Sequence, residues 1–184
     1  DQGRIRNPYL STYLIPTVVD VARALDVSHG SVYRHFASKA SLRDAVAERW
    51  LARIAAPLAA VAAEPGPAPQ RLWRWLHLLA ELKRRYASSD PQLFATYMAV
   101  VTEARAVVVT HVAGLVGQVE SIIAAGVASG EFAPADPKEV AQAVFDATVR
   151  FHKPLHAAEW TQPGMDARLD AVCRLILRGL GAAT

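Results

Sequence analysis

Apolar side chains recur every three or four residues along nearly the whole chain, and this feature limits the fold more than any other. Leu72, Leu76 and Leu79, for example, return to one face of a helix. No segment shows the convincing alternation of apolar and polar residues that indicates a strand. Even the β-branched run at 107–109 lies inside a longer helical pattern. We therefore predict an all-α protein.

Cap and turn signals divide this pattern into helices joined by short loops. Residues 64–69, EPGPAP, form a loop by their proline and glycine content. Asp90-Pro91 and Asp136-Pro137 each place an N-cap residue before a proline at the first helical position. Gly130 predicts a helix end, and Pro163-Gly164 separates the last helix from the one before it. We expect eight or nine helices.

The excess positive charge of the chain lies near its start. Residues 1–53 contain eight of the 20 Lys and Arg residues but five of the 17 Asp and Glu residues, which leaves twelve of each sign for the rest. This distribution suits a polyanionic partner, although a solvated surface with three spare charges is equally ordinary. We place a domain boundary inside the long helix that follows Ser38, with a small unit at 1–45 and a larger, very apolar one at 46–184.

Composition also bears on location. The single cysteine, Cys173, excludes an internal disulfide and lies among apolar neighbours, so we expect a packed side chain and a cytoplasmic protein. We expect no signal peptide and no membrane span, because no run approaches about 18 apolar residues.

Two short helical patterns between Asp20 and Leu42 are separated by only three residues, at 26–28. Such a bihelical corner is typical of DNA-binding units, in which the second helix enters the major groove. That helix is rich in polar side chains that a core does not need. His29 and Ser31 can contact bases or phosphates, and Gly30 allows a close backbone approach. The predicted DNA-binding residues are Thr17, Ser28, His29, Gly30, Ser31, Tyr33, Arg34, His35 and Lys39.

The stretch TVVDVARALDVSHGSVYRHFASKASL resembles the DNA-binding signature of the TetR family of bacterial transcriptional regulators. The family pattern is an apolar-rich helix, then GVS, a variable residue and glycine, LYxHF, and a short xSKxxL. Asp26 stands where the family has the glycine of GVS, and Ser38-Lys39 matches SK. The segment before Thr17 departs from the family, since it is short, contains Pro8 and Pro16 and lacks an amphipathic stripe.

The resemblance implies a ligand pocket in the larger domain. Aromatic and methionine side chains with few polar groups suit a small apolar or aromatic molecule. The alternative is that each of these residues simply fills the core. The candidates are Trp73, His77, Phe94, Tyr97, Met98, Val101, Phe145, Thr148 and His152.

The resemblance also implies a homodimer in which the last two helices pair across a two-fold axis. The expected interface residues are Val144, Phe151, Leu155, Leu169, Val172, Ile176 and Leu180. Such a dimer would bind a palindromic operator as a repressor, and the ligand would release it by favouring another spacing of the two recognition helices.

Other functions have weaker support. His152 and His156 share a helix face as zinc ligands can, but Pro154 lies between them and HExxH is absent. Glycine-rich phosphate loops and GxSxG are absent too, so we expect no enzyme, no metal and no cofactor. The main rival is an all-α ligand-binding or interaction protein without DNA affinity.

Overall fold

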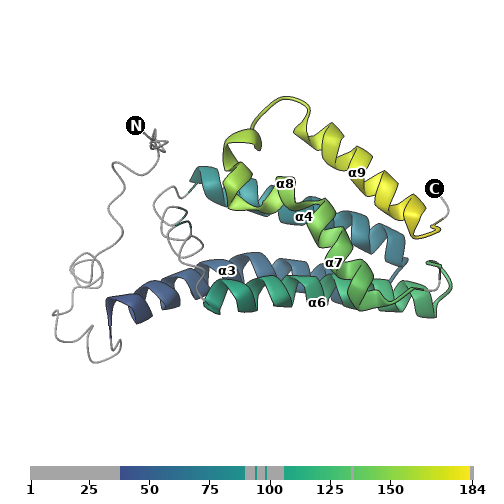
Figure 1. Ribbon diagram of the computed structural model, residues 1–184, viewed down its shortest axis with the longest axis horizontal. Helices are drawn as coiled ribbons and strands as arrows, with labels where there is room; N and C mark the ends of the chain where they lie inside the picture. Colours follow the sequence, from purple (N-terminus) through teal and green to yellow (C-terminus); the bar gives the residue numbers. More distant parts are fainter. Residues whose placement is uncertain (1–37, 90–93, 95–97, 99–105, 134, 183–184) are drawn as a thin grey trace, which may run out of the picture.

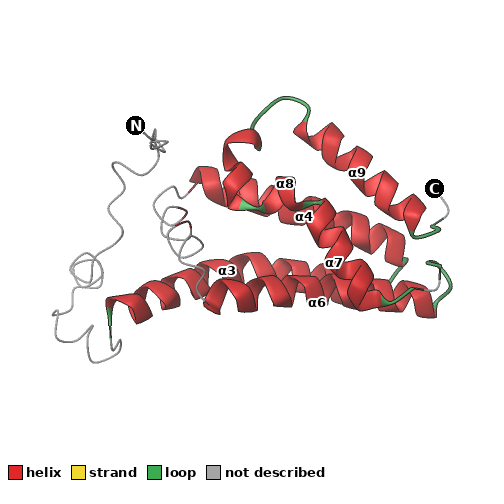
Figure 2. Ribbon diagram, viewed as in Figure 1, coloured by secondary structure: helices red, strands yellow, loops and turns green. Residues whose placement is uncertain are grey.

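The computed structural model of the protein describes residues 38–89, 94, 98, 106–133 and 135–182. Every regular element within these residues is helical (Figures 1 and 2), which confirms the all-α prediction. The elements are α3 (Lys39–Ala63), α4 (Ala68–Ser89), α6 (Ala106–Ala128), α7 (Pro137–Ala147), α8 (Val149–His152), the 3-10 helix η2 (Pro154–Glu159) and α9 (Met165–Gly179).

Ser38 is the N-cap of helix α3, as the sequence predicted. The Ser38 hydroxyl oxygen accepts a hydrogen bond from the Ser41 backbone N–H at 3.1 Å, and the Ser41 hydroxyl oxygen accepts one from the Ser38 backbone N–H at 3.0 Å. This reciprocal capping box satisfies two N–H groups that the first turn leaves without helical partners. The helix then continues through Pro57 for 25 residues, across the predicted domain boundary at 45–46.

Helix α4 is central to the packing of the larger domain. On one side α4 contacts α3 and α6, which lie next to each other in Figure 1. On its other side α4 contacts α8, η2 and α9, while α7 packs against α6. A side chain on α4 can therefore face either the α3 and α6 layer or the carboxyl-terminal helices.

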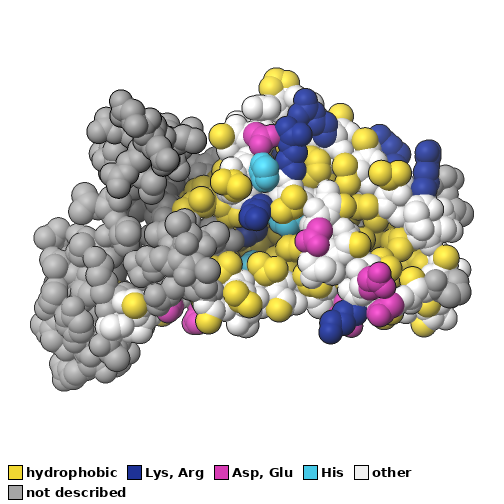
Figure 3. Space-filling view, viewed as in Figure 1, with side chains coloured by type: hydrophobic (Ala, Val, Ile, Leu, Met, Phe, Trp, Pro, Cys, Tyr) yellow, Lys and Arg dark blue, Asp and Glu magenta, His cyan; other side chains and the backbone are white. Residues whose placement is uncertain are grey.

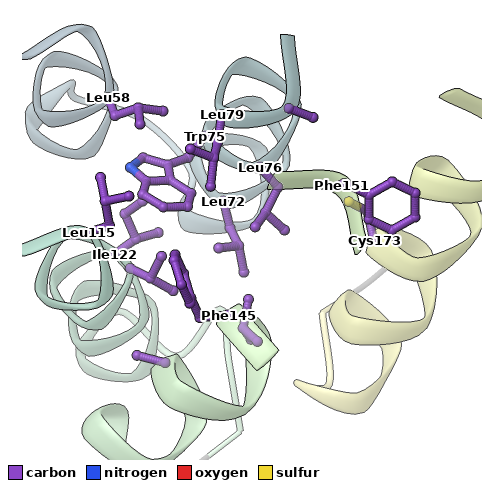
Figure 4. Close-up of a cluster of buried hydrophobic side chains, with 14 of the residues drawn as sticks. Leu58, Leu72, Trp75, Leu76, Leu79, Leu115, Ile122, Phe145, Phe151 and Cys173 are labelled. Carbon is purple, nitrogen blue, oxygen red and sulfur yellow. The ribbon is translucent and has the colours of Figure 1, made fainter. Parts of the chain in front are cut away.

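The core between these layers is apolar and comes from several helices (Figure 4). Trp75 of α4, Leu58 of α3 and Ile122 of α6 are completely buried. The predicted α4 stripe is confirmed, because Leu72, Leu76 and Leu79 are all at most 3% exposed. Large buried side chains of this kind supply most of the free energy that favours folding.

The turn after α6 is fixed by a close approach between helices. Gly126 lies against the Phe132 ring and the Ala68 side chain, so an added Cβ would lie 2.8 Å from the Ala68 Cβ. The Glu131 carboxylate accepts a hydrogen bond from the Ala68 backbone N–H at 3.2 Å and caps α4 from another segment. Gly130 has a φ of +75° beyond the end of the helix, as its sequence position predicts.

The segment after Asp136 differs from the single helix that we expected. Asp136 caps α7 through the Lys138 backbone N–H as predicted. The helix nevertheless ends at Thr148, whose hydroxyl donates to the carbonyl oxygens of Val144 (2.9 Å) and Phe145 (3.2 Å). A hydroxyl that bonds to its own backbone competes with helical hydrogen bonds. Pro154 then starts η2, because proline cannot donate the N–H that a continued helix needs.

Helix α6 is long and apolar enough to cross a membrane by length and composition, which corrects our expectation that no such run exists. Only 28% of its most apolar window is buried within the chain. Its inward row, which includes Leu115, Val119 and Ile122, is completely or almost completely buried against neighbouring helices. A core helix of a folded domain has the same composition, so this finding alone is weak support for a membrane partner.

Helix α9 begins after Gly164, which has a φ of +83°, and the predicted break at Pro163-Gly164 is confirmed. Cys173 points into the core and is 0% exposed, as expected for a packed side chain. Burial raises the pKa of its thiol to about 12, so the thiol stays protonated and unreactive near neutral pH.

Candidate functional site

The predicted DNA-binding residues stand at the edge of the described chain or before it. Lys39 is the first residue of α3, and the structure describes its backbone position only. The other predicted DNA-binding residues lie outside the described residues. They are Thr17, Ser28, His29, Gly30, Ser31, Tyr33, Arg34 and His35. Their roles remain predictions.

A buried lysine is the most unusual side chain of the larger domain. Lys83 lies on α4 and is only 3% exposed, although lysine is almost never buried without compensation. Its Nζ lies 5.3 Å from the centroid of the Trp50 ring, in a cation–π arrangement that links α4 to α3. Burial lowers the pKa of Lys83 to about 7. Burial therefore disfavours the charged form of this amine, which changes its protonation near neutral pH.

Two histidines lie within electrostatic reach of Lys83. Burial, and then the nearby Lys83 charge, lower the pKa of His111 on α6 to about 3. Burial also lowers the pKa of His152 on α8 to about 4, with a smaller contribution from Lys83. Both imidazoles are therefore neutral at pH 7. We name Lys83, His111 and His152 the basic cluster.

The break between α7 and α8 orients His152. Its Nε2 donates a hydrogen bond to the Phe145 carbonyl oxygen at 3.2 Å. The two rings lie 4.3 Å apart between centroids in a tilted arrangement. Thr148 is 1% exposed and donates to the same carbonyl oxygen. Three predicted ligand-binding residues, Phe145, Thr148 and His152, thus lie together, and His152 is also a member of the basic cluster.

Further aromatic rings gather around Trp50, whose own ring lies beside the Lys83 side chain. The Trp50 ring makes edge contacts with Tyr86 and Phe94, at centroid distances of 6.0 and 6.3 Å. Phe94 also contacts Trp160 at 6.3 Å. In Figure 3, lysine or arginine and histidine side chains lie among hydrophobic side chains near the middle of the visible face. The neighbourhood of the basic cluster is therefore strongly apolar and aromatic.

Trp73 and His77 face a different part of the molecule. Their rings stack at 4.7 Å on α4, and His77 Nε2 lies 3.1 Å from a carboxylate oxygen of Asp170 on α9. The structure therefore does not bring this pair to the rings around Trp50. Met98 is half-buried, and Tyr97 and Val101 lie outside the described residues.

A small cavity lies on the α9 side of Trp160. Its volume is about 10 Å3, room for roughly one water molecule. The ion pair of Arg84 with Asp166, at 2.7 Å, borders it. This cavity is too small for an organic ligand.

The predicted interface residues fall into two groups. Val172 and Ile176 of α9 are half-buried, and Leu155 is 75% exposed. The rest are buried within a single chain and can add little area to a dimer contact. They are Val144, Phe151, Leu169 and Leu180. Leu175, which we did not predict, is 72% exposed on α9.

The two histidines that we weighed as zinc ligands have separate partners. His156 Nδ1 lies 2.8 Å from the Glu159 carboxylate, whereas His152 bonds the Phe145 carbonyl oxygen. Among the described residues, no group of three or more His, Cys, Asp or Glu side chains could hold a metal ion.

Comparison with protein families assigns both parts of the chain. The model of the tetracycline-repressor-like C-terminal domain matches residues 68–173, more than half of the chain. The chain belongs to the TetR family. The model of the bacterial regulatory proteins of the tetR family also matches, at residues 17–46, which contain the predicted helix-turn-helix. This TetR-family protein is a DNA-binding transcriptional regulator, and the members of its family are regulators rather than enzymes.

Solved structures show the same architecture. The TetR family transcriptional regulator PfmR from Thermus thermophilus is 25% identical, with a TM-score of 0.58 over 94% of this chain and 91% of that one. A Rhodococcus sp. RHA1 protein of unknown function is 25% identical, with a TM-score of 0.64 over 89% and 84%. FadR from Bacillus subtilis, solved with stearoyl-CoA, is 17% identical and shares the fold, with a TM-score of 0.65 over 94% and 91%. No curated protein matches.

Sequence reasoning missed Lys83, His111 and Trp50. A signal for Lys83 was present, because it follows Leu79 by four residues and Leu76 by seven on the core face of α4. His111 likewise precedes Leu115 by one turn on the inward row of α6. A charged or titratable residue in a core register is a useful indicator of a site.

Proposed function

We propose that this protein is a homodimeric repressor that a small ligand releases from its operator. The position of Trp50 carries the proposal. The Trp50 ring lies beside the Lys83 side chain in the larger domain. Trp50 also belongs to α3, and the first residue of this helix, Lys39, lies in the DNA-binding motif. Eleven residues of helix separate the two, about 16 Å.

A ligand that contacts Trp50 would act on α3 directly. Since α3 is one continuous helix, a tilt at Trp50 moves its amino-terminal end and the recognition helix next to it. In a dimer such a tilt changes the spacing of the two recognition helices, which must fit major grooves roughly 34–36 Å apart. The ligand releases DNA only if it binds more tightly to the dimer whose recognition helices do not fit the two grooves than to the dimer whose helices do.

The sensed molecule is small and apolar or aromatic in this proposal. Support comes from the rings of Trp50, Tyr86 and Phe94, which lie in edge contact and make this part of the domain apolar and aromatic. Phe145, Thr148 and His152 would border the molecule from α7 and α8. A cytoplasmic location follows from a DNA target. The proposed units remain 1–45 for DNA binding and 46–184 for sensing and dimerisation.

A mobility-shift titration tests the proposal. We expect the protein to shift DNA taken from upstream of its own gene, with affinity that falls steeply as salt is added because phosphate contacts release counterions. A duplex of the same length and scrambled sequence is the control. Equal, weak binding to both duplexes would favour the rival, a ligand-binding protein without specific DNA affinity.

A further inference from the structure

The charged side chains of α9 divide into two sets. Its two acidic residues have partners on α4, because Asp166 pairs with Arg84 at 2.7 Å and Asp170 lies 3.1 Å from His77 Nε2. Its three arginines are exposed, and none of them forms an ion pair within the described part of the chain. We name Arg168, Arg174 and Arg178 the arginine face of α9.

Apolar side chains lie next to the arginine face. Leu175 is 72% exposed, and Val172 and Ile176 are half-buried. The spacing of four and then three residues from Arg168 through Val172 to Leu175 places these side chains next to one another on the helix. A surface of this kind suits a protein partner that supplies both apolar area and carboxylates.

Helix α7 presents carboxylates at the surface. Glu139 and Asp146 are both exposed and seven residues apart, so they lie on one side of the helix. The exposed N-cap residue Asp136 adds a third carboxylate, and Lys138 is the only lysine or arginine of the helix. No other described helix has a larger excess of acidic residues. We name Asp136, Glu139 and Asp146 the acidic face of α7.

The two faces do not neutralise each other within one chain. The structure gives no ion pair or hydrogen bond between α7 and α9 in the described residues. In Figure 3, Asp or Glu side chains are visible over α7 and Lys or Arg side chains along α9, so both helices contribute to the face that this view shows. One partner can therefore meet both sets of charges.

We propose that the arginine face of α9 pairs with the acidic face of α7 in a second copy of this chain. This inference rests on the proposed homodimer and specifies which charges meet in it. A two-fold axis repeats the contact, so α7 of the first copy also meets α9 of the second. A contact of α9 with its own copy would instead bring the arginines of both chains together, and like charges across an interface are unfavourable.

The charges select the partner, whereas the apolar side chains supply affinity. An exposed ion pair adds little to binding, because water and salt weaken the attraction. Two like charges at the same place exclude a wrong partner or a wrong register. Leu175 and its half-buried neighbours add apolar area, which strengthens association in any correct register.

Reversal of the charges on each face tests the inference. The first variant combines Arg168→Glu with Arg174→Glu, and the second combines Glu139→Arg with Asp146→Arg. In sedimentation equilibrium on the full chain, each variant alone should have a dimer dissociation constant about tenfold or more above that of the wild type, because like charges meet twice.

Two combinations should restore association. An equimolar mixture of the variants should form a heterodimer, which native mass spectrometry identifies by its mass, because opposite charges meet again at both contacts. A chain with all four substitutions should dimerise about as tightly as the wild type for the same reason. Recovery in the mixture also shows that both variants are folded. Arg49→Glu combined with Arg53→Glu is the matched control, since both arginines are exposed on α3 and should leave the dimer unchanged.

A measurement without variants supports or contradicts the same inference. The wild-type dimer should weaken between about 0.1 and 1 M salt, where the screening length falls from about 10 to about 3 Å. A dimer of unchanged strength across this range would contradict the charge pairing.

The remaining outcomes separate this inference from the homodimer itself. A wild-type dimer that neither variant weakens, or variants that mixing does not rescue, would overturn the charge pairing and leave the homodimer standing. A wild-type chain that is monomeric in the same buffer would overturn the homodimer. If the arginine variant dimerises normally but no longer shifts DNA, the arginine face binds a polyanion and the proposed pairing fails.

Discussion

The Trp75 indole N–H donates a hydrogen bond to Gln118 Oε1 at 3.0 Å, across the boundary between α4 and α6. The same Gln118 amide donates from Nε2 to the Ala55 carbonyl oxygen of α3 at 3.2 Å. One side chain thus connects the three helices that surround the apolar core. The connection lies within the larger domain and holds the helix that leads from the DNA-binding motif against α4 and α6.

Loss of this amide should destabilise the protein. Gln118→Leu leaves the buried Trp75 N–H without an acceptor, which we expect to cost about 1–3 kcal/mol of unfolding free energy. Urea unfolding followed by tryptophan fluorescence measures the change. Gln142→Leu is the control, since Gln142 is exposed and bonds Asp146 on its own helix. Equal losses in the two variants would show that the bridge contributes nothing.

Two glycines of α6 should respond in opposite directions to the same substitution. Gly126→Ala would force a Cβ against the Phe132 ring and to 2.8 Å from the Ala68 Cβ. We expect a loss of about 1–3 kcal/mol in the free energy of unfolding.

Gly117→Ala provides the comparison, because no atom lies within 4 Å of its added Cβ. Alanine in a helix interior should stabilise the protein by about 0.5–1 kcal/mol relative to glycine. Thermal unfolding of both variants measures the difference. A neutral Gly126→Ala would mean that the turn after α6 relaxes freely.

Stability should rise with pH through two windows. The folded pKa values of His111 and His152, about 3 and about 4, lie below the ordinary histidine value of 6.5, so the unfolded chain binds more protons across that interval. Unfolding free energy therefore falls as the pH drops below 6.5. Besides burial, the charges of Lys83 and His156 lower the pKa of His152, and the charge of Asp146 raises it.

The second pH range in which stability should change depends on Lys83. Its folded pKa of about 7 lies below the ordinary value of 10.5, so unfolding free energy should increase between pH 7 and about 9.5, on the order of 1 kcal/mol or more. Urea midpoints across the range test this. In Lys83→Met the rise above pH 7 should be smaller than in the wild type. A wild-type midpoint that falls across this range would contradict the burial of the ammonium.

The exposed leucines of the carboxyl-terminal segments should contribute to the dimer. Leu155 and Leu175 are 75% and 72% exposed in the single chain, so both can bury apolar area in a contact with a second chain. Leu155→Arg combined with Leu175→Arg should shift the protein toward monomer in sedimentation analysis. Val109→Arg, at an exposed position on α6, should leave the assembly unchanged. If Val109→Arg produced monomer and the leucine variant did not, the dimer interface would involve α6 instead.

Substitutions in and next to the recognition helix should have two different effects on DNA binding, one on affinity and one on base preference. Tyr33→Phe and Lys39→Ala should weaken binding to all duplexes by similar factors, because both residues are expected at phosphates. His29→Ala and Ser31→Ala should change which bases are preferred. Competition binding with a library of operator variants distinguishes the two effects. If none of the four changes alters binding, the recognition helix is assigned incorrectly.

Local signals predicted the helix boundaries well. Ser38, Asp136 and Gly164 act through their own backbone neighbourhood, so a single sequence contains the necessary information. The end of α7 was missed because threonine is acceptable inside a helix. Only the structure shows that Thr148 turns its hydroxyl to Val144 and ends the run.

The site was harder to predict because it depends on which helices meet. Spacing placed Trp73 and His77 correctly on one flank of α4, but not opposite α9, where Asp170 lies beside His77. Lys83 and His111 belong to helices separated by an undescribed stretch, and periodicity gives no distance between them. The predicted ligand-binding residues therefore included His152 but omitted Lys83 and His111.

The sealed position of Cys173 makes the protein convenient for distance measurements. Since the native sulfur is shielded and protonated, a thiol introduced at Val109 would be the accessible one for a spin label or fluorophore in the described part of the chain. Each chain would then carry one probe, and a symmetric pair would report a single separation. Changes in that separation upon addition of an effector could be followed without removal of Cys173.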